Sequence, residues 1–464
     1  MYDFLEIVGA TSSFKLVGAT QSGFIKPPKK VQVQCIDQQT GLVYEEPYYG
    51  TDTATYGARI PLGYFKVRVV AYNEYGMIMA ATKPLLLYKT LVPGFVYIKR
   101  GAFTIGSPAN AVGHQSNENQ ANYKLTKDFM IQRTPCTGAY LRKVADAYHT
   151  VTKTGLTRTK VTNANWYSPE PALPADMFGY SGTGSWVEND FTPAVSISWE
   201  RIMDVQTTNA NSTVASHVAV AYPFTDYAGV CTALNAMNTS GSDYYCSGWN
   251  YCLPTEAQWE YACRGGTTTA LYNGTGLDST AVPAYTAANS PQPNLQRIAW
   301  YNYNSYGSKK VVGQLEPNRW GLYDMLGNVW EWVLDQYNSS YTSVLNGGET
   351  LHGSPVYTEV TSTSWSVNGV WRGGRYGLPY WCRSGYRDYF GDTLDRTSGG
   401  LGFRIGVESA ETRRQWVNGV VRGGGYQTRS QYARSDMRYT TGKGGGYDYR
   451  GFRCEWWCDK GSAF

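Results

Sequence analysis

The sequence predicts an α+β protein with short strands, few helices and long, ordered loops. Among 464 residues there are 51 Gly, 39 Tyr and 15 Trp, while charged residues make up only 17%. Disordered chains combine low hydrophobicity with high charge, so this composition predicts a folded protein. Alternating apolar and polar residues recur over short segments, and a clear helical pattern appears at residues 255–262. The length is sufficient for two or three domains.

The first part of the chain is predicted to be a small all-β domain behind an N-terminal arm. Residues 30–36 and 60–72 alternate in strand fashion. Residues 30–90 resemble the immunoglobulin-like β-sandwich modules that act as spacers on phage and surface proteins. Residues 1–29 contain Val-Gly-Ala-Thr twice. We interpret them as an arm that docks to a partner, and a chance repeat is the alternative.

Charge and cysteine content exclude several classes of function. The net charge is only +5 and no basic run is present, so nucleic-acid binding is not expected. No apolar run has membrane-spanning length, and the first residues lack a signal-peptide pattern. Nine Cys do not indicate a disulfide framework. For Cys454 and Cys458, buried thiols, a terminal disulfide and a metal or redox pair remain open. The four His are scattered and predict no metal cluster.

A second, larger domain is predicted for residues 95–464, after a Leu-Val-Pro-Gly linker. Within residues 253–266, Thr255 can cap a helix that buries Trp259 and Ala262 on one face. Residues 138–190 and 336–366 are rich in Thr, Asn, Ser, Gly and Tyr, and are predicted to be surface loop insertions.

The last quarter of the chain contains one segment twice, at residues 367–408 and 417–458. Each copy has Val-Asn-Gly-Val and Arg-Gly-Gly near its start and Gly-Phe-Arg near its end. Between these motifs the copies diverge and contain mainly Tyr, Arg, Gly, Ser and Asp. A constant frame around a variable aromatic and polar interior is typical of a binding surface. The predicted core residues of the two copies are Trp371, Trp381, Phe403 and Phe452.

Several segments, in this order, resemble the formylglycine-generating-enzyme superfamily, a variant of the C-type lectin fold. They are residues 95–107, 193–200, 253–266 and 320–332, followed by the Arg-Gly-Gly and Gly-Phe-Arg motifs. The resemblance implies this fold for residues 95–464. It says less about activity, because the superfamily includes oxidases, sulfoxide synthases and non-catalytic binding proteins.

The residues that catalysis would require are not matched. In the formylglycine-generating enzymes, two cysteines after Arg-Gly-Gly form a copper-binding thiol pair. The first copy contains only Cys382 in this segment, and the second copy contains no cysteine between Gly425 and Arg438. The sulfoxide synthases need a three-His iron site, which the spacing of the four His does not suggest. We therefore expect no enzymatic activity and no organic cofactor.

The resemblance also implies a structural calcium site. Its ligands would be the side chains of Asp324 and Glu331 and the carbonyl groups of Gly327 and Val329. Hard oxygen donors from one tight loop suit Ca²⁺. The alternative is a pair of carboxylates tied into helix caps and turn amides.

The family also includes target proteins of diversity-generating retroelements, in which adenines of codons such as AAC are randomised. The first copy fits such variation, with Gly385 among its permitted positions and with Trp381, Cys382, Arg383, Ser384 and Arg387 as frame. The second copy fits less well, since it contains Gln427 and Met437. The residues predicted to contact a ligand are Arg375, Tyr376, Tyr380, Tyr386, Asp388, Tyr389, Phe390, Tyr426, Arg429, Tyr432, Tyr439 and Tyr447.

Together these features predict a non-enzymatic receptor-binding or adhesion protein. We expect a phage tail or fibre tip on the virion that binds a host-cell surface protein or glycan. The N-terminal domain would attach to other virion proteins, and a homo-oligomer is expected. One alternative is a structural decoration protein of a virion or a bacterial cell surface. A formylglycine-generating-type oxidase is the third interpretation.

Overall fold

The computed structural model describes residues 4–16, 27–50, 53–125, 127–152, 191–195, 197, 202, 230–277, 291–336, 369–375, 378–388, 400–409, 419–421 and 439–441. The chain forms two compact units, Met1–Val356 with Trp365–Ser409, and Tyr357–Ser364 with Ala410–Phe464. The described part of the second unit is an antiparallel ladder of β21 (Gly419–Val421) and β22 (Tyr439–Thr441).

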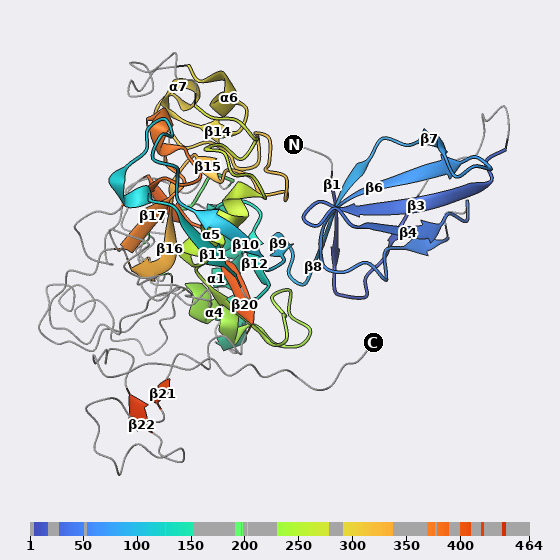
Figure 1. Cartoon of the computed structure of the whole chain (residues 1–464). Helices are drawn as coiled ribbons and strands as arrows, with labels where there is room; N and C mark the ends of the chain where they lie inside the picture. The colour runs from blue at the N-terminus through green and yellow to red at the C-terminus, as the bar shows by residue number, and fades with distance from the viewer. Residues whose placement is uncertain are drawn as a thin grey trace, which may run out of the picture. The chain divides into compact units, whose positions relative to one another are not determined.

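The N-terminal part is built on a six-stranded sheet, drawn in blue in Figure 1. The strand order is β1-β8-β6-β3-β4, and β7 also pairs with β6. The strands are β1 (Phe4–Val8), β3 (Lys30–Asp37), β4 (Val43–Pro47), β6 (Gly63–Tyr72), β7 (Ile78–Ala81) and β8 (Leu85–Thr90). The two strands predicted from alternation correspond to β3 and β6, which pair antiparallel along the whole length of β3.

A short second ladder covers part of this sheet. It consists of β2 (Phe14–Lys15) and β5 (Thr55–Tyr56). Phe14 and Tyr56 belong to one buried cluster with Val33, Phe65 and Leu87 of the sheet. The described part of this domain is all-β, as predicted. An immunoglobulin-like sandwich is not confirmed, because the described second layer consists only of β2 and β5, which have two residues each.

The prediction of a separate N-terminal arm is wrong for residues 4–16. β1 pairs in parallel with β8, from Phe4 opposite Leu86 to Val8 opposite Thr90. β1 is short and its partner lies about eighty residues further along the chain, so alternation within residues 1–29 could not indicate the pairing. The second Val-Gly-Ala-Thr, at residues 17–20, lies outside the described residues.

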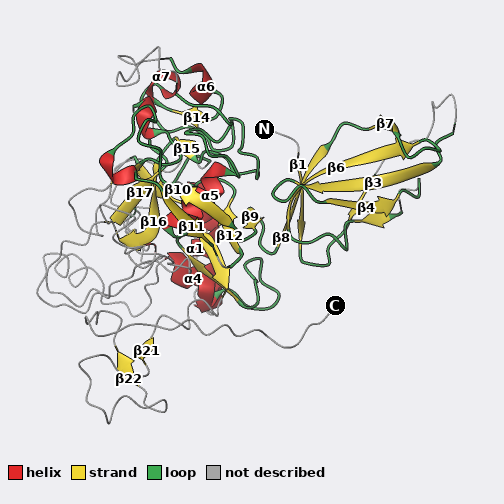
Figure 2. Cartoon of the chain, in the orientation of Figure 1, coloured by secondary structure: helices red, strands yellow, loops and turns green. Residues whose placement is uncertain are grey.

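Two four-stranded sheets form the larger domain. The first has the order β13-β20-β12-β9, and the second has the order β18-β17-β16-β19. Figure 2 shows helices beside these sheets. The strands of the first sheet are β9 (Phe95–Ile98), β12 (Phe129–Gln132), β13 (Trp249–Cys252) and β20 (Gly406–Ser409). Those of the second are β16 (Trp330–Gln336), β17 (Gly369–Arg372), β18 (Arg387–Asp388) and β19 (Leu401–Phe403).

Smaller ladders and helices complete the described part of this domain. The ladders pair β10 (Ala102–Ile105) with β11 (Ala121–Lys124), and β14 (Ala299–Trp300) with β15 (Leu326–Gly327). The helices are α1 (Gly138–Thr152), α4 (Val230–Ala236), α5 (Glu256–Arg264), α6 (Pro293–Gln296) and α7 (Asn302–Ser305). No helix in the described ranges is long and apolar enough to cross a membrane. The α+β class is confirmed.

The predicted loop at residues 138–190 is wrong at its start, because Gly138–Thr152 is helical. Leu141 and Val144 are buried and stand three residues apart, which is the spacing of one helix face. The many Thr, Tyr and Ala residues around them concealed this short pattern. Residues 153–190 and the predicted insertion after residue 336 lie outside the described residues.

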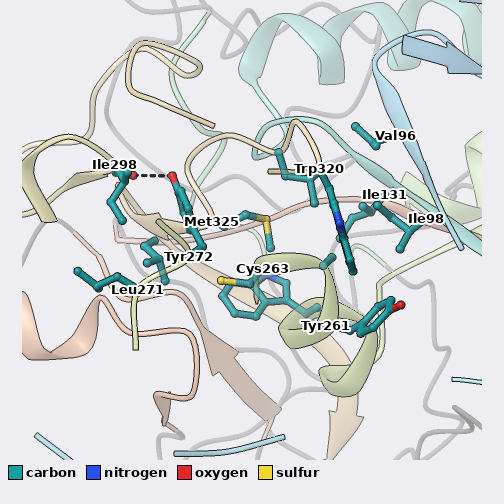
Figure 3. Packing of buried hydrophobic residues seen from close by; sticks show 14 of the residues in the cluster. Val96, Ile98, Ile131, Tyr261, Cys263, Leu271, Tyr272, Ile298, Trp320 and Met325 are labelled. Atoms are coloured by element: carbon teal, nitrogen blue, oxygen red, sulfur yellow. Dashed lines mark hydrogen bonds between the residues drawn. The ribbon is translucent and has the colours of Figure 1, made fainter. Parts of the chain in front are cut away.

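Helix α5 forms as its sequence predicts. Thr255 accepts a hydrogen bond from the Gln258 amide, and the Gln258 side chain accepts one from the Thr255 amide, which completes a capping box. The helix ends at Gly265, whose φ of 54° is left-handed. Trp259 and Ala262 are fully buried, as predicted. They belong to the main hydrophobic cluster, part of which Figure 3 shows around Cys263, Trp320 and Met325.

Arg133 joins the N-terminal sheet to the larger domain. Its guanidinium lies 4.2 Å from the ring centres of both Phe4 and Tyr88, and it pairs with Glu6. The Tyr88 hydroxyl donates a 2.8 Å hydrogen bond to the Gly321 carbonyl. These contacts join residues on either side of the predicted Leu-Val-Pro-Gly linker. The N-terminal sheet therefore packs against residues of the larger domain.

Candidate functional site

The first repeat copy is arranged around β16. This strand pairs antiparallel with β17, which carries the Arg-Gly-Gly motif, and in parallel with β19, which carries the Gly-Phe-Arg motif. The two ends of the repeat thus flank the strand that ends the Trp320–Trp332 motif. In the sequence between these two motifs, the described elements are the 3₁₀ helix Pro379–Trp381 and β18. We treat this first repeat copy as the candidate binding site.

Arg372 of the Arg-Gly-Gly motif is fully buried and lies against α5. Its guanidinium donates to Glu256 at 3.1 Å, to the carbonyl oxygen of Ser384 at 2.8 Å, and to Glu260. Glu256 also receives two 2.7 Å hydrogen bonds from Arg387. One helix therefore supplies the counter-charges for two arginines of the repeat segment.

Two further arginines of this segment are held in the same way. Arg404 of the Gly-Phe-Arg motif makes two 2.7 Å hydrogen bonds to Glu331. Arg383 donates to both oxygens of Glu118, at 2.8 Å and 2.7 Å. We call these eight residues the buried arginine frame: Arg372, Arg383, Arg387 and Arg404 with Glu118, Glu256, Glu260 and Glu331. Bidentate arginine–carboxylate pairs fix orientation as well as position, so the frame holds the segment rigidly.

Charge neutralisation inside the frame is visible at Glu260. Burial by itself raises the pKa of this carboxyl group, but the nearby Arg372 and Arg264 outweigh burial and hold the pKa below its ordinary value. Arg264, four residues further along α5, donates to Glu260 at 2.9 Å. Glu260 is therefore ionised in the folded protein.

Two glycines of the first repeat copy, Gly374 and Gly385, pack closely against the backbone of other segments. Gly374 has a φ of 70°, and a Cβ there would lie 2.8 Å from the backbone of Trp381. Gly385 has no positive φ, but a Cβ at this position would meet the Ser107 hydroxyl and come within 3.0 Å of the backbone of Gly106. Gly385, predicted as a permitted variable position, has no room for a side chain.

Among the described residues 372–388, five side chains are part-exposed: Arg375, Leu378, Tyr380, Trp381 and Asp388. We call the four charged or aromatic ones, Arg375, Tyr380, Trp381 and Asp388, the rim. The Arg375 guanidinium lies 5.8 Å from the Trp381 ring centre, and the Tyr380 ring stands edge-on to Trp381 at 5.8 Å. Trp381 also lies 5.8 Å from the buried Trp330. The rim is therefore an aromatic and charged surface supported from below by another aromatic residue.

Tyr386, predicted to contact a ligand, is buried, so that prediction is wrong. Its ring packs 5.5 Å from Trp330 and 6.1 Å from Tyr380, with the Arg383 guanidinium 5.4 Å away. Burial of Cys382, Arg383, Ser384, Arg387 and Phe403 agrees with their predicted structural role. Trp381, predicted as frame and core, is only partly buried.

The structure does not describe most of the other predicted contact residues. Arg375 and Tyr380 both lie beside Trp381. Asp388 is part-exposed and accepts a 3.4 Å hydrogen bond from the Tyr386 hydroxyl, and Tyr439 has a described backbone in β22. The positions outside the described residues are Tyr376, Tyr389, Phe390, Tyr426, Arg429, Tyr432 and Tyr447, together with the predicted core residue Phe452. The side chain of Trp371 is likewise not described. Ligand contact at these predicted contact residues, and core positions for Trp371 and Phe452, stay predictions.

A loop that the sequence did not single out also borders the rim. The Arg383 guanidinium donates to the carbonyl of Gly113 at 2.5 Å, and a Cβ at Gly113 would lie 3.2 Å from the Cβ of Tyr380. His114 follows, and its Nδ1 is buried without a hydrogen-bond partner. No local pattern around residues 107–118 indicated this contact, because it depends on the pairing of Arg383 with Glu118.

The single cysteine of this segment is a buried thiol. Cys382 is fully buried, and burial raises its pKa well above the ordinary value. Cys263 of α5 is also buried, with its pKa raised to about 12 by burial, and its sulfur lies 3.6 Å from the Ser384 hydroxyl. The seven described cysteines are all free. Cys454 and Cys458 lie outside the described residues.

Both carboxylates among the four predicted calcium ligands accept hydrogen bonds from other parts of the protein. Both oxygens of Glu331 accept hydrogen bonds from Arg404, and Oε2 also accepts one from Trp259 at 2.8 Å. Asp324 accepts a 2.6 Å hydrogen bond from the Gly313 amide through Oδ2, while its buried Oδ1 has no hydrogen-bond partner. Within the described ranges, no three His, Cys, Asp or Glu side chains are grouped to hold a metal ion. Glu331 thus belongs to the arginine frame, and calcium binding stays a prediction.

The α+β fold, with the Arg-Gly-Gly strand β17 and the Gly-Phe-Arg strand β19 on either side of β16, is that of a formylglycine-generating-enzyme-like domain. Residues 87–457 match the family described as the sulfatase-modifying factor enzyme 1-like domain, and the chain belongs to this family.

Curated relatives match a shorter part of the chain. The formylglycine-generating enzyme of Mycobacterium tuberculosis (strain ATCC 25618 / H37Rv) is 40% identical over 87 residues, which are 18% of this chain and 27% of that protein. The inactive C-alpha-formylglycine-generating enzyme 2 of Mus musculus is 34% identical over 102 residues, 20% of this chain and 29% of that protein. The chain thus spans less than a third of either relative.

Solved structures show a weak overall similarity. PvdO from Pseudomonas aeruginosa is 22% identical, with a TM-score of 0.41 over 68% of this chain and 94% of that chain. Treponema denticola variable protein 1 is 18% identical, with a TM-score of 0.37 over 67% of this chain and 93% of that chain.

Proposed function

We propose that this protein is a non-enzymatic receptor-binding or adhesion protein, and that its rim contacts a ligand on a host-cell surface. The observation that carries the proposal is the division within residues 372–388 between a rigid, buried arginine frame and a part-exposed aromatic and charged rim. Aromatic and Arg side chains on a rigid support contribute most to binding, since little conformational entropy is lost when the ligand binds.

The chemistry of Cys382 supports binding in preference to oxidation. The thiolate is the form of cysteine that reacts and binds metals, and burial keeps the Cys382 thiol protonated. The relatives include both formylglycine-generating enzymes and inactive ones, so family membership is compatible with either role.

We further propose that the protein is located on a phage tail or fibre. The N-terminal sheet would attach the protein to other virion components, while the rim faces the host cell. A decoration protein of a virion or cell surface would have the same fold but would not need a ligand at the rim.

Cell binding by the labelled full-length chain tests the proposal. We expect binding to intact bacteria to fall at least tenfold in an Arg375→Ala, Tyr380→Ala double variant, because the rim loses its charge and one ring. Tyr245→Ala is a matched control, since Tyr245 is 41% exposed and lies elsewhere in the chain. Undiminished binding by the double variant would contradict the role of the rim.

A second measurement separates binding from catalysis. Cys382→Ser should leave cell binding unchanged, and the full-length chain supplied with copper should not form formylglycine on a cysteine-containing peptide. Formylglycine production that disappears in Cys382→Ser would instead establish the oxidase. Absence of cell binding together with incorporation into particles would favour the decoration protein.

A further inference from the structure

The longest exposed stretch among the described residues lies in the N-terminal sheet. Residues 74–85 are twelve consecutive exposed residues. They include β7, in which all four residues are exposed. A strand in a folded domain normally buries alternate side chains, because successive side chains point to opposite faces. Neither face of β7 is covered by the described part of the chain.

This stretch is strongly apolar. Soluble monomers rarely expose contiguous apolar surface of this kind, and such patches mark interaction sites. The large apolar side chains, with their exposed fractions, are Tyr75 (77%), Met77 (61%), Ile78 (52%), Met79 (40%) and Leu85 (54%).

The strand at the opposite side of the sheet differs. β4 ends in Glu45, Glu46 and Pro47, and it is the last strand in the sheet order. Charged residues and proline on an edge strand prevent association with other chains. β7 has the sequence Ile-Met-Ala-Ala, with neither a charge nor a proline. Of these two strands, β7 is the one suited to contact another surface.

The ladder geometry indicates the kind of contact. β7 pairs with β6 with a register shift, since Ala80 lies opposite Ala71 and Ile78 lies opposite Tyr72. Met79 is therefore the extra residue of a β-bulge. A bulge increases the local twist, which disfavours extension of the sheet by another strand. The contact would thus be made by the apolar side chains and not by a continued ladder.

The charges at the two ends of the stretch make it self-complementary. Glu74 and Lys83 are exposed, and neither forms an ion pair with a described residue. When two copies meet around a two-fold axis perpendicular to β7, the stretch of one copy runs antiparallel to that of the other. Glu74 of each copy then faces the end that carries Lys83 in its partner, with the apolar residues between them.

We propose that residues 74–85 are a dimerisation surface for a second copy of this chain. Tyr75, Met77, Ile78, Met79 and Leu85 form the centre of the contact, and the Glu74 and Lys83 side chains of opposite copies pair at its two ends. This inference is independent of the ligand proposed for the rim. Two associated copies would display two rims, which would strengthen attachment to a surface with many receptors.

Sedimentation of the full-length chain over a concentration series tests the dimer. We expect a dimer that dissociates on dilution, with Ile78→Lys raising the dissociation constant at least tenfold. Val43→Lys on β4 is the matched control, since Val43 is 50% exposed and should leave the constant unchanged. A monomer up to about 100 μM would overturn the proposal. So would a dimer that Ile78→Lys and Val43→Lys affect equally.

A charge exchange tests the two-fold arrangement. Glu74→Lys and Lys83→Glu should each weaken the dimer several-fold, because like charges then meet at both ends. The double variant should restore association. A double variant as weak as the single variants would overturn the antiparallel arrangement. All of these positions are exposed, so unchanged thermal unfolding serves as the control for folding.

Discussion

Two arginines of the repeat segment, Arg383 and Arg375, contrast in environment. Arg383 is fully buried, donates to both oxygens of Glu118 and reaches the Gly113 carbonyl. Arg375 is part-exposed and lies over Trp381. The first residue belongs to the arginine frame and the second to the rim. Residue type alone therefore does not indicate which arginine of a repeat is available to a ligand, because that depends on the distant partner it reaches.

The largest expected effect concerns the centre of the frame. Arg372→Ala leaves the buried carboxylates of Glu256 and Glu260 without one of their counter-charges. Removing one partner of a buried ion pair typically costs about 3–5 kcal/mol. We expect a loss of this size in the free energy of unfolding, measured by urea denaturation. A loss below about 1 kcal/mol would show that the frame does not hold the segment.

A smaller effect on the same frame is expected from the pH dependence of stability. Because Arg372 and Arg264 hold the pKa of Glu260 below its ordinary value, this group stabilises the fold at pH values above about 4.5, and its contribution is lost as the pH falls further. Glu260→Gln should lower the free energy of unfolding at pH 7 by about 1.5–3 kcal/mol. The same substitution should also reduce the fall in the free energy of unfolding between pH 5 and pH 3. An unchanged acid profile would contradict the ionised state of Glu260.

A third substitution tests whether Gly385 is a fixed or a variable position. Gly385→Ser adds a side chain where a Cβ would lie 3.0 Å from the Gly106 backbone. Such overpacking costs about 1–3 kcal/mol, so the melting temperature should fall. Asp388→Ser, at a part-exposed position three residues further on, is the control and should leave the melting temperature nearly unchanged. Equal stability of both variants would place Gly385 among the variable positions after all.

The smallest effect on stability is expected at the rim. Tyr380→Ala should change the free energy of unfolding by no more than about 1 kcal/mol, because Tyr380 is only partly buried. The same substitution should have a large effect on cell binding. A variant that unfolds as readily as Arg372→Ala would remove the distinction between frame and rim.

Local signals in the sequence predicted the local parts of the structure. Thr255, Gln258 and the apolar spacing of Trp259 and Ala262 were sufficient for α5, since capping and helical periodicity act within a few residues. The resemblance to retroelement target proteins implied that Cys382 to Ser384 would belong to the fixed frame.

Long-range partners could not be predicted in this way. Arg372 lies 116 positions from Glu256, and Arg404 lies 73 positions from Glu331. The family resemblance implied Glu331 as a calcium ligand, whereas the folded chain pairs it with Arg404. Tyr386 was taken as exposed for the same reason, because its burial depends on Trp330, and β1 was missed because it pairs with β8.

The parallel pairing of β1 with β8 has a mechanical consequence. Tension between the N-terminus and the domain after Thr90 pulls the two strands in opposite directions along their length. Their hydrogen bonds are then loaded together in shear, whereas an antiparallel hairpin pulled at its open end separates one bond at a time. Glu6 of β1 also accepts a 3.0 Å hydrogen bond from the Gly94 amide and pairs with Arg133. The N-terminal sheet is therefore built to transmit force along the chain without unzipping.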